Sequence, residues 1–165
     1  MKLKLEILKE TDVNQTYLEW FLDNKVTYYS NNQYRSFSIE GQKKYLNSCL
    51  VSKDVDLFGI FDGDVHIGNI VINGLSSVHK CAEITYLVGN QNYWGKGVGS
   101  FAVSEIILKA KSVYKLNKLY AGIAERNIRS QRVLEKNGFE LEGRRIKHLF
   151  FGGQFHNQLD YGLLL

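Results

Sequence analysis

The amino-acid sequence predicts an α+β domain, with a mixed, mostly antiparallel sheet flanked by helices on both faces. Three observations support this fold class. Many short segments have the length and apolar content of strands, and several longer segments have apolar residues at helical spacing. Most of the predicted strands follow one another directly, and one strand–helix–strand crossover lies among them. The 165 residues suit a single domain spanning 1–165, and 44% hydrophobic with 23% charged residues is typical of a globular chain.

The N-terminal third predicts one strand and two helices. Apolar and charged residues alternate over 3–7, which indicates the first strand. Thr11-Asp12 can cap a helix whose apolar residues then follow at helical spacing. Residues 24–37 have weak periodicity and many polar and tyrosine side chains, so a loop is expected there. A second helix then opens at Ser38 and runs to about Leu50.

The rest of the chain predicts strands, two helices and a terminal hairpin. Since the chain has no proline, Gly, Asn and Asp must mark its turns. Asp62-Gly63 is such a turn, and Gly138 can end a helix in the left-handed conformation. The expected strands are 56–61, 65–73, 81–88, 118–124, 139–151 and 154–164, and the expected helices are 97–113 and 127–137.

Composition argues against several classes of protein. The net charge of +4 is modest and its Lys and Arg residues are spread along the chain, so no nucleic-acid partner is expected. Cys49 and Cys81 have no motif spacing, which predicts neither a disulfide framework nor a metal site. The N-terminus lacks a signal-peptide core and no apolar run approaches the roughly 20 residues of a membrane span. We therefore expect a cytoplasmic protein with no membrane partner.

The most specific motif is Tyr93-Trp94-Gly95-Lys96-Gly97-Val98-Gly99, between a predicted strand and a predicted helix. Alternate glycines allow a tight turn that exposes successive N–H groups, and the helix start adds unpaired donors and a positive dipole end. These features predict a pyrophosphate cradle made by residues 95–100, namely Gly95, Lys96, Gly97, Val98, Gly99 and Ser100. The spacing matches neither the P-loop nor the dinucleotide-binding fingerprint.

This segment resembles the acetyl-CoA pyrophosphate loop of the GNAT superfamily of N-acetyltransferases, with Trp94 where the family pattern has Arg or Gln. A second segment, from Asn127 to Phe139, is similar to the family's Asn-x-x-Ser…Glu-Lys-x-Gly-Phe motif. Trp20 with residues 22–26 resembles a motif of the branch that contains the ribosomal-protein acetyltransferases. The resemblance covers nearly the whole chain and implies a GNAT-like fold with acetyl-CoA as acetyl donor.

The resemblance also implies roles for single residues. Leu87 and Val88 would pair with the pantetheine arm and supply an oxyanion donor, where the strand before the glycine loop splays from its neighbour. Asn127 would contact the same arm, although a helix cap alone also explains an Asn there.

Candidates for the acid–base groups are few. Glu83 matches a family position where a carboxylate can take the amine proton, and a Glu that only ties strands together is nearly as well supported. His148 and His156, on the terminal hairpin, are the other candidate bases. Leu134 occupies the place of the tyrosine acid found in many relatives, so Ser130 or a nearby tyrosine would have to protonate the thiolate, unless no group does.

The acceptor amine is the least constrained feature. Tyr28, Tyr34 and Arg35 lie in the predicted loop at 24–37 and could stack on rings or grip phosphate, which favours a nucleotide-linked amino sugar for surface polysaccharides. The alternatives are a protein N-terminus of the ribosomal-protein type, a polyamine or an antibiotic. A non-catalytic acetyl-CoA sensor is an alternative of another class. The resemblance is compatible with a homodimer.

Overall fold

The computed structural model describes all 165 residues and contains one seven-stranded sheet in the order β1-β2-β3-β4-β5-β7-β6. Only the β4–β5 pair is parallel, as the predicted single crossover requires. The expected mixed, mostly antiparallel sheet is thus confirmed. The strands are β1 Leu3–Ile7, β2 Val55–Asp62, β3 Val65–Asn73, β4 Cys81–Val88, β5 Lys118–Ala124, β6 Glu140–Phe151 and β7 Gln154–Leu164.

The helices agree with the sequence prediction except in the first forty residues. They are α1 Gln15–Leu22, α2 Asn24–Thr27, α3 Ile39–Val51, α4 Val98–Ser112 and α5 Ile128–Lys136. The predicted cap at Thr11-Asp12 was wrong, because those residues belong to a short 3-10 turn and the Asn14 side chain caps α1 by accepting from the Tyr17 N–H. The predicted loop at 24–37 also contains α2 and a 3-10 turn at Asn31–Tyr34.

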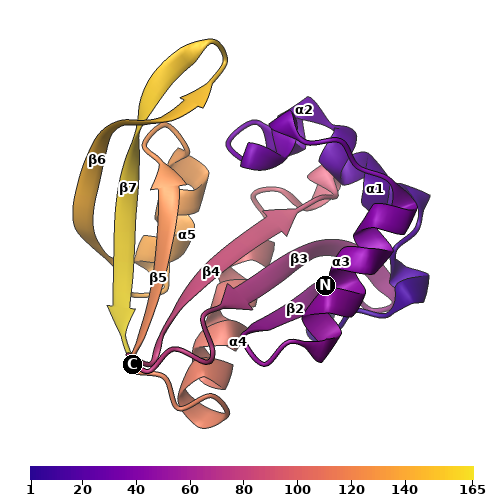
Figure 1. The fold of residues 1–165 in the computed structure, drawn as a ribbon, viewed down its shortest axis with the longest axis horizontal. Helices are drawn as coiled ribbons and strands as arrows, with labels where there is room; N and C mark the ends of the chain where they lie inside the picture. The colour runs from indigo at the N-terminus through magenta and orange to yellow at the C-terminus, as the bar shows by residue number, and fades with distance from the viewer.

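Helices lie on both faces of the sheet (Figure 1). On one face, α4 packs its apolar side chains, such as Ala102 and Ile106, on Ala82 and Ile84 of β4 in the larger of two hydrophobic cores. On the other face, Trp20 of α1 and Leu46 of α3 pack over the strands of the N-terminal half in the smaller core. No helix of the chain is long and apolar enough to cross a membrane.

Strands β4 and β5 start as neighbours and then separate. Their pairing is limited to Cys81↔Lys118, Ala82↔Leu119 and Glu83↔Tyr120. Beyond Glu83, β4 continues on β3 alone and β5 continues on β7 alone. Figure 1 shows the resulting V, with its narrow end near the C-terminus of the chain.

One half of the sheet has an uncovered face. Helices α1, α2 and α3 lie over the N-terminal strands, whereas β5, β7 and β6 carry no helix on that side (Figure 1). Since Ala82 and Ile84 point into the α4 core, the alternation of a strand turns Glu83 toward this open side. Tyr120, its register partner on β5, is 40% exposed there. The narrow end of the V is therefore accessible to solvent from the open face.

Candidate active site

The glycine loop leaves a row of backbone donors at the start of α4. Gly95 and Gly97 have φ values of +75° and +82°, and a Cβ atom on either would meet nothing within 4 Å. The first helical hydrogen bond runs from the Phe101 N–H to the Gly97 carbonyl. The N–H groups from Gly97 to Ser100 consequently have no acceptor within the protein. This geometry fits an anionic ligand at a helix N-terminus.

Aromatic and cationic side chains frame that loop. The Trp94 indole N–H donates to the Val88 carbonyl over 2.7 Å, which ties the loop to the end of β4. The Arg129 guanidinium, from the first turn of α5, lies 5.3 Å from the Trp94 ring centroid, and the Lys96 ammonium lies 5.9 Å from that of Tyr93. Two positive charges thus lie beside the aromatic rings of the loop. Trp94, in the place of the family's Arg or Gln, anchors the loop to β4 through its indole N–H.

The start of α5 closes the same end of the gap. The Asn127 side chain accepts from the Ser130 N–H over 3.2 Å, so the capping role considered for Asn127 is present. Its side-chain amide N–H groups have no partner within the protein. Asn137, at the other end of α5, donates to the Ser100 hydroxyl over 3.0 Å and fixes α5 against α4. Leu134 is fully buried in the core and cannot replace a catalytic tyrosine.

Tyr86 supplies a phenol in this region. It lies on β4 beyond the last β4–β5 pair, on the face of α4 and α5, and its ring packs beside Gly99. Burial raises the pKa of Tyr86, and the neighbouring Ser130 hydroxyl lowers it by a smaller amount. The phenol therefore carries its proton at neutral pH and can act as a donor. Ser130 lies one helical turn before Leu134 on α5, so this pair of hydroxyls is on the same side of the helix as the place of the missing tyrosine.

The end of β4 is only partly free to bind a ligand arm. The Leu87 carbonyl lies against Gly68 of β3, and the Val88 carbonyl is taken by Trp94. The edge of β4 that faces β5 is unpaired from Ile84 onward. That a ligand pairs with the backbone of Leu87 and Val88 stays a prediction. Such a ligand would have to bind backbone groups other than the Leu87 and Val88 carbonyls.

Glu83 lies at the base of the V, where the gap opens. Its carboxylate has no hydrogen-bond or ion-pair partner in the chain. Burial raises the pKa of Tyr120, and the negative charge of Glu83 raises it further, so the two side chains are close. An unpartnered carboxylate at this point fits a proton acceptor better than a residue that links two strands, because a linking carboxylate would have a hydrogen-bond or ion-pair partner on the neighbouring strand.

The two histidines differ in their surroundings. His156 is buried, its ring is stacked on Phe151 at 3.8 Å between centroids, and its Nε2 lies 3.1 Å from the Phe151 carbonyl oxygen. Such packing fits a structural role at the hairpin tip. His148 is exposed on β6, in a stretch where the pairing with β7 is irregular. Neither position favours a base at the V over Glu83.

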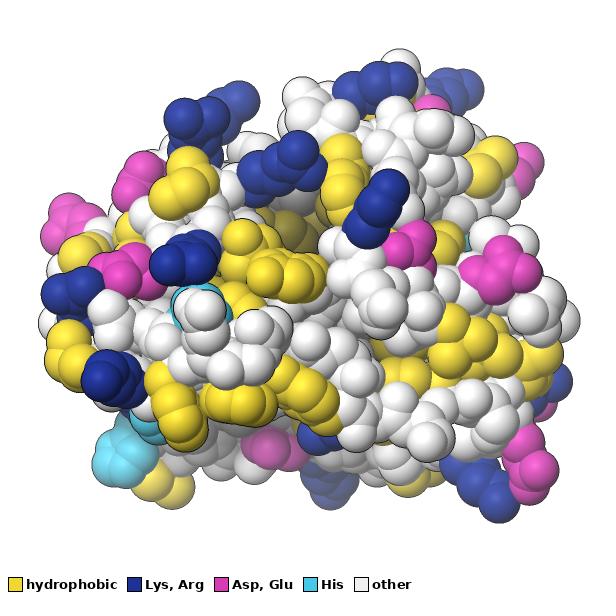
Figure 2. Space-filling view, turned by 90° about the horizontal axis from the view of Figure 1, so that it is seen from above, with side chains coloured by type: hydrophobic (Ala, Val, Ile, Leu, Met, Phe, Trp, Pro, Cys, Tyr) yellow, Lys and Arg dark blue, Asp and Glu magenta, His cyan; other side chains and the backbone are white.

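Tyrosines from segment 24–37 cross the wide end of the gap. The Tyr34 hydroxyl donates to the Phe150 carbonyl over 2.6 Å, and the Tyr29 hydroxyl donates to the Arg126 carbonyl over 3.1 Å. Tyr28 and Tyr29 both pack edge-on against Phe151. We call this set, Tyr28, Tyr29, Tyr34 and Phe151, the tyrosine bridge. Seen from this end, the molecule is hollowed at its centre, with hydrophobic side chains in the hollow and Lys and Arg around it (Figure 2).

The structure brings together some predicted acceptor residues and separates another. Tyr28 and Tyr34 belong to the tyrosine bridge, next to the Gly152-Gly153 turn of the hairpin. Arg35 is exposed and lies near Tyr45 of α3: burial raises the pKa of Tyr45, and the positive charge of Arg35 offsets a smaller part of that rise. Arg35 is thus placed toward α3, whereas the tyrosines reach the hairpin.

Sequence reasoning did not single out Tyr86 or Arg129. Each is recognised only through a partner distant in the chain, which is the Ser130 hydroxyl for Tyr86 and the Trp94 ring for Arg129. Arg129 lies inside the Asn127–Phe139 motif, and its position in the first turn of a helix after a strand was an available signal.

Comparisons with known proteins show the family of the chain. Residues 2–140 match the family model described as "Acetyltransferase (GNAT) domain". "Probable N-acetyltransferase YjcK" of Bacillus subtilis is 33% identical over 136 residues, which cover 78% of this chain and 74% of that protein. "Putative ribosomal N-acetyltransferase YdaF" of the same organism is 31% identical over 105 residues, which cover 64% of this chain and 56% of that protein.

Solved structures share the fold over almost the whole chain. A Vibrio cholerae spermidine N-acetyltransferase in complex with CoA and spermine superposes with a TM-score of 0.88 at 18% identity, covering 99% of this chain and 95% of that one. RimL, a ribosomal L7/L12 alpha-N-protein acetyltransferase in complex with coenzyme A, has a TM-score of 0.88 at 20% identity, covering 100% and 95%. The family match and the site together show that the chain belongs to the GNAT family, the N-acetyltransferases that take their acetyl group from acetyl-CoA.

Proposed function

We propose that this chain acetylates the N-terminal α-amine of a polypeptide, with acetyl-CoA as donor. One observation carries the choice of acceptor. Glu83, at the base of the V, is an unpaired carboxylate, whereas the carboxylates in the hollow beside it are already ion-paired: Glu142 with Lys118 at 2.6 Å and Asp160 with Arg145 at 2.7 Å. One free carboxylate suits an acceptor with one reacting amine. A polyamine would require further free carboxylates for its remaining ammonium groups.

The acid–base chemistry supports the same acceptor. An α-amine has a pKa near 8 and an alkylamine one near 10.4, so at about pH 7.5 roughly a quarter of the former but only about one in a thousand of the latter is neutral. The site offers Glu83 and no histidine at the V. A weakly basic α-amine therefore needs less help from the protein than a polyamine does.

The roles of the residues follow from their positions. The N–H groups of Gly97 to Ser100, with Lys96 and Arg129 beside them, hold the pyrophosphate of the donor. The unpaired edge of β4 orients the pantetheine arm, whose thioester supplies the acetyl group. Glu83 accepts the amine proton, directly or through water, and Ser130 with Tyr86 donates a proton toward the departing sulfur. This assignment gives Leu134 no chemical part.

The names of the relatives support a protein acceptor and also keep a second candidate. YdaF and RimL are described as ribosomal-protein acetyltransferases, whereas the Vibrio cholerae protein and an Escherichia coli relative, 27% identical over 92 residues, are described as spermidine acetyltransferases. None of these names refers to an amino sugar. The placement of Arg35 toward α3 also weakens the amino-sugar expectation, so we do not retain it as the main proposal.

A thiol-release assay tests the proposal with three acceptors: a short peptide with a free N-terminus, spermidine and a nucleotide-linked amino sugar. We expect kcat/KM for the peptide to exceed both others by tenfold or more. The matched control is the same peptide with an acetylated N-terminus, which excludes reaction at side chains. Faster turnover of spermidine, or equal turnover of the blocked peptide, would overturn the assignment of an α-amine acceptor.

A further inference from the structure

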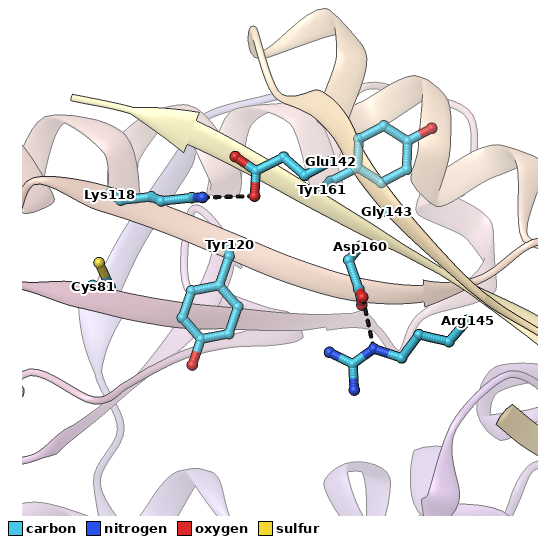
Figure 3. Close-up of a pocket in the computed structure, with 8 residues that line it drawn as sticks. All are labelled: Cys81, Lys118, Tyr120, Glu142, Gly143, Arg145, Asp160 and Tyr161. Carbon is cyan, nitrogen blue, oxygen red and sulfur yellow. Dashed lines mark hydrogen bonds and ion pairs between the residues drawn. The ribbon is translucent and has the colours of Figure 1, made fainter. Parts of the chain in front are cut away.

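A hollow of about 360 Å³ lies on the uncovered face of β5, β7 and β6. Its wall residues come from four strands, and two ion pairs stand at its ends (Figure 3). Lys118–Glu142 forms one end and Arg145–Asp160 the other, with Tyr120 between them. The proposed α-amine chemistry uses none of these charged groups.

Arg145 has an incomplete set of partners. Its Nε donates to an Asp160 oxygen over 2.7 Å, and its two outer nitrogens have no acceptor in the chain. Figure 3 shows these nitrogens turned away from Asp160, on the side that faces Tyr120. The neighbouring Arg144 is different, because its Nε and one outer nitrogen both bind Glu125, at 2.7 Å and 3.1 Å. The Arg144 guanidinium is thus bound through two nitrogens, whereas the Arg145 guanidinium presents its two outer nitrogens to the hollow.

Asp160 is held in a fixed position and thereby orients Arg145. Its other oxygen accepts from the Gln158 side-chain amide over 2.7 Å. Although burial acts against it, these hydrogen bonds from Gln158 and Arg145 keep the pKa of Asp160 below its ordinary value. Asp160 thus remains ionised at neutral pH and fixes the Nε side of the guanidinium. The outer edge is then ready for a second carboxylate, since a guanidinium fork matches two carboxylate oxygens.

The hollow lies within reach of an acceptor bound at Glu83. Tyr120 is the register partner of Glu83 on β5, and it pairs with Gly162 of β7, two residues along that strand from Asp160, which binds Arg145 of β6. Two strand spacings of about 4.8 Å and two residues of about 3.3 Å along β7 place the Arg145–Asp160 pair roughly 10–15 Å from Glu83. An extended peptide covers roughly 3.3 Å per residue, so its third or fourth residue reaches Arg145 while its amine is at Glu83.

We propose that Arg145 is a specificity site that binds an acidic side chain at the third or fourth residue of the acceptor polypeptide. This inference rests on the proposed α-amine acceptor. The exposed Tyr120 ring supplies the apolar floor over which the intervening residues lie. Lys118 contributes less, because its ammonium is already bound to Glu142 and its side chain is only 26% exposed.

The test measures kcat/KM for two peptides that differ only at positions 3 and 4, with Glu in one and Gln in the other. We expect wild type to prefer the Glu peptide by about tenfold through KM, because the contact is made in both ground and transition state. Arg145→Gln should remove the preference while turnover of the Gln peptide stays within about threefold. Arg144→Gln is the matched control and should keep the preference.

Each outcome bears on the proposal. A preference that is absent in wild type, or that survives Arg145→Gln, overturns it. If free glutamate is acetylated as fast as the peptides, with the same dependence on Arg145, then the Arg145 guanidinium binds a small acidic amine. That result would overturn the proposal of a peptide acceptor at this site. Turnover of neither peptide in wild type would instead refute the α-amine acceptor itself. The KM for acetyl-CoA and the melting temperature report whether Arg145→Gln folds, and Arg145→Lys, which keeps the charge but loses the fork, gives a second variant.

Discussion

Substitution of Gly97 tests whether the glycine loop holds the donor through its backbone. Gly97 is the N-cap of α4, with φ +82° and ψ 4°, and a Cβ there would meet no protein atom within 4 Å. A side chain at this position therefore introduces backbone strain without a clash inside the protein. Left-handed backbone costs most L-residues roughly 1–2 kcal/mol, but Asn tolerates it. If the loop relaxes to relieve that strain, the Kd for acetyl-CoA rises about 5- to 30-fold, at 1.4 kcal/mol per factor of ten.

The expected order of acetyl-CoA affinity is wild type, then Gly97→Asn, Gly97→Ala and Gly97→Val. Valine should abolish measurable binding, because a β-branched residue is strained most in this conformation and its methyl groups project toward the exposed N–H row. Isothermal titration calorimetry gives the Kd, and a thermal melt confirms that each variant folds. Gly63 is a matched control, since it also has positive φ, at +59°, and open space around it, but it lies in the β2–β3 turn. Gly63→Ala should lower the melting temperature and leave the Kd unchanged.

Two results would refute this reasoning. Wild-type affinity in both Gly97→Ala and Gly97→Val, with the fold intact, would mean that the loop does not bind the donor. An equal loss of affinity in Gly63→Ala would mean that strain anywhere in the protein weakens binding, and that the loop has no special part.

Three further predictions concern other parts of the molecule. Glu83→Gln should lower turnover on the order of 10²-fold with acetyl-CoA affinity unchanged, and turnover within about twofold of wild type from about pH 6 to 9 would assign proton acceptance to solvent. Tyr34→Phe removes the 2.6 Å hydrogen bond to the Phe150 carbonyl, which is worth about 1 kcal/mol. This substitution should raise the acceptor KM several-fold with no change in the KM for acetyl-CoA. An unchanged acceptor KM would mean that the tyrosine bridge has no part in acceptor binding. Burial lowers the pKa of His66 below its usual 6.5, so the unfolded chain binds the proton more readily than the folded one. The free energy of unfolding is therefore highest above about pH 6.5 and decreases as the pH falls below that value. Urea unfolding should show a smaller loss of stability on acidification in His66→Gln than in wild type, and an identical pH slope would contradict this.

The sequence was sufficient for elements whose signals are local. The hairpin turn at Asp62-Gly63 and the strand at 65–73 that follows it were predicted with their bounds, because the turn residues and the apolar run of the strand are neighbours in the sequence. The glycine loop was also recognisable, since its left-handed glycines and the helix start lie within seven residues. The cap of α1 was not, because Thr11-Asp12 and Asn14 are both plausible caps, and a 3-10 turn before the helix decided between them.

Properties that depend on distant partners could not be predicted in this way. Tyr34 bonds to a carbonyl 116 residues further along the chain, and nothing near it in sequence indicates that contact. Arg144 and Arg145 are neighbours with identical chemistry, yet one is bound by two nitrogens and the other by one. Their difference arises from strand alternation and from the bulge in β6 between Leu141 and Gly143, which sets the side chains that each arginine meets.

The V between β4 and β5 has a consequence for solubility. A seven-stranded sheet normally has two edges, but the splay creates two more, along β4 after Glu83 and along β5 after Tyr120. Unpaired strand edges are templates for pairing with other chains, and proteins protect them with obstructing groups. Trp94 covers the last carbonyl of β4, and the tyrosine bridge crosses the wide end of the V. The groups that frame the binding gap thereby also shield these inner edges from a strand of another molecule.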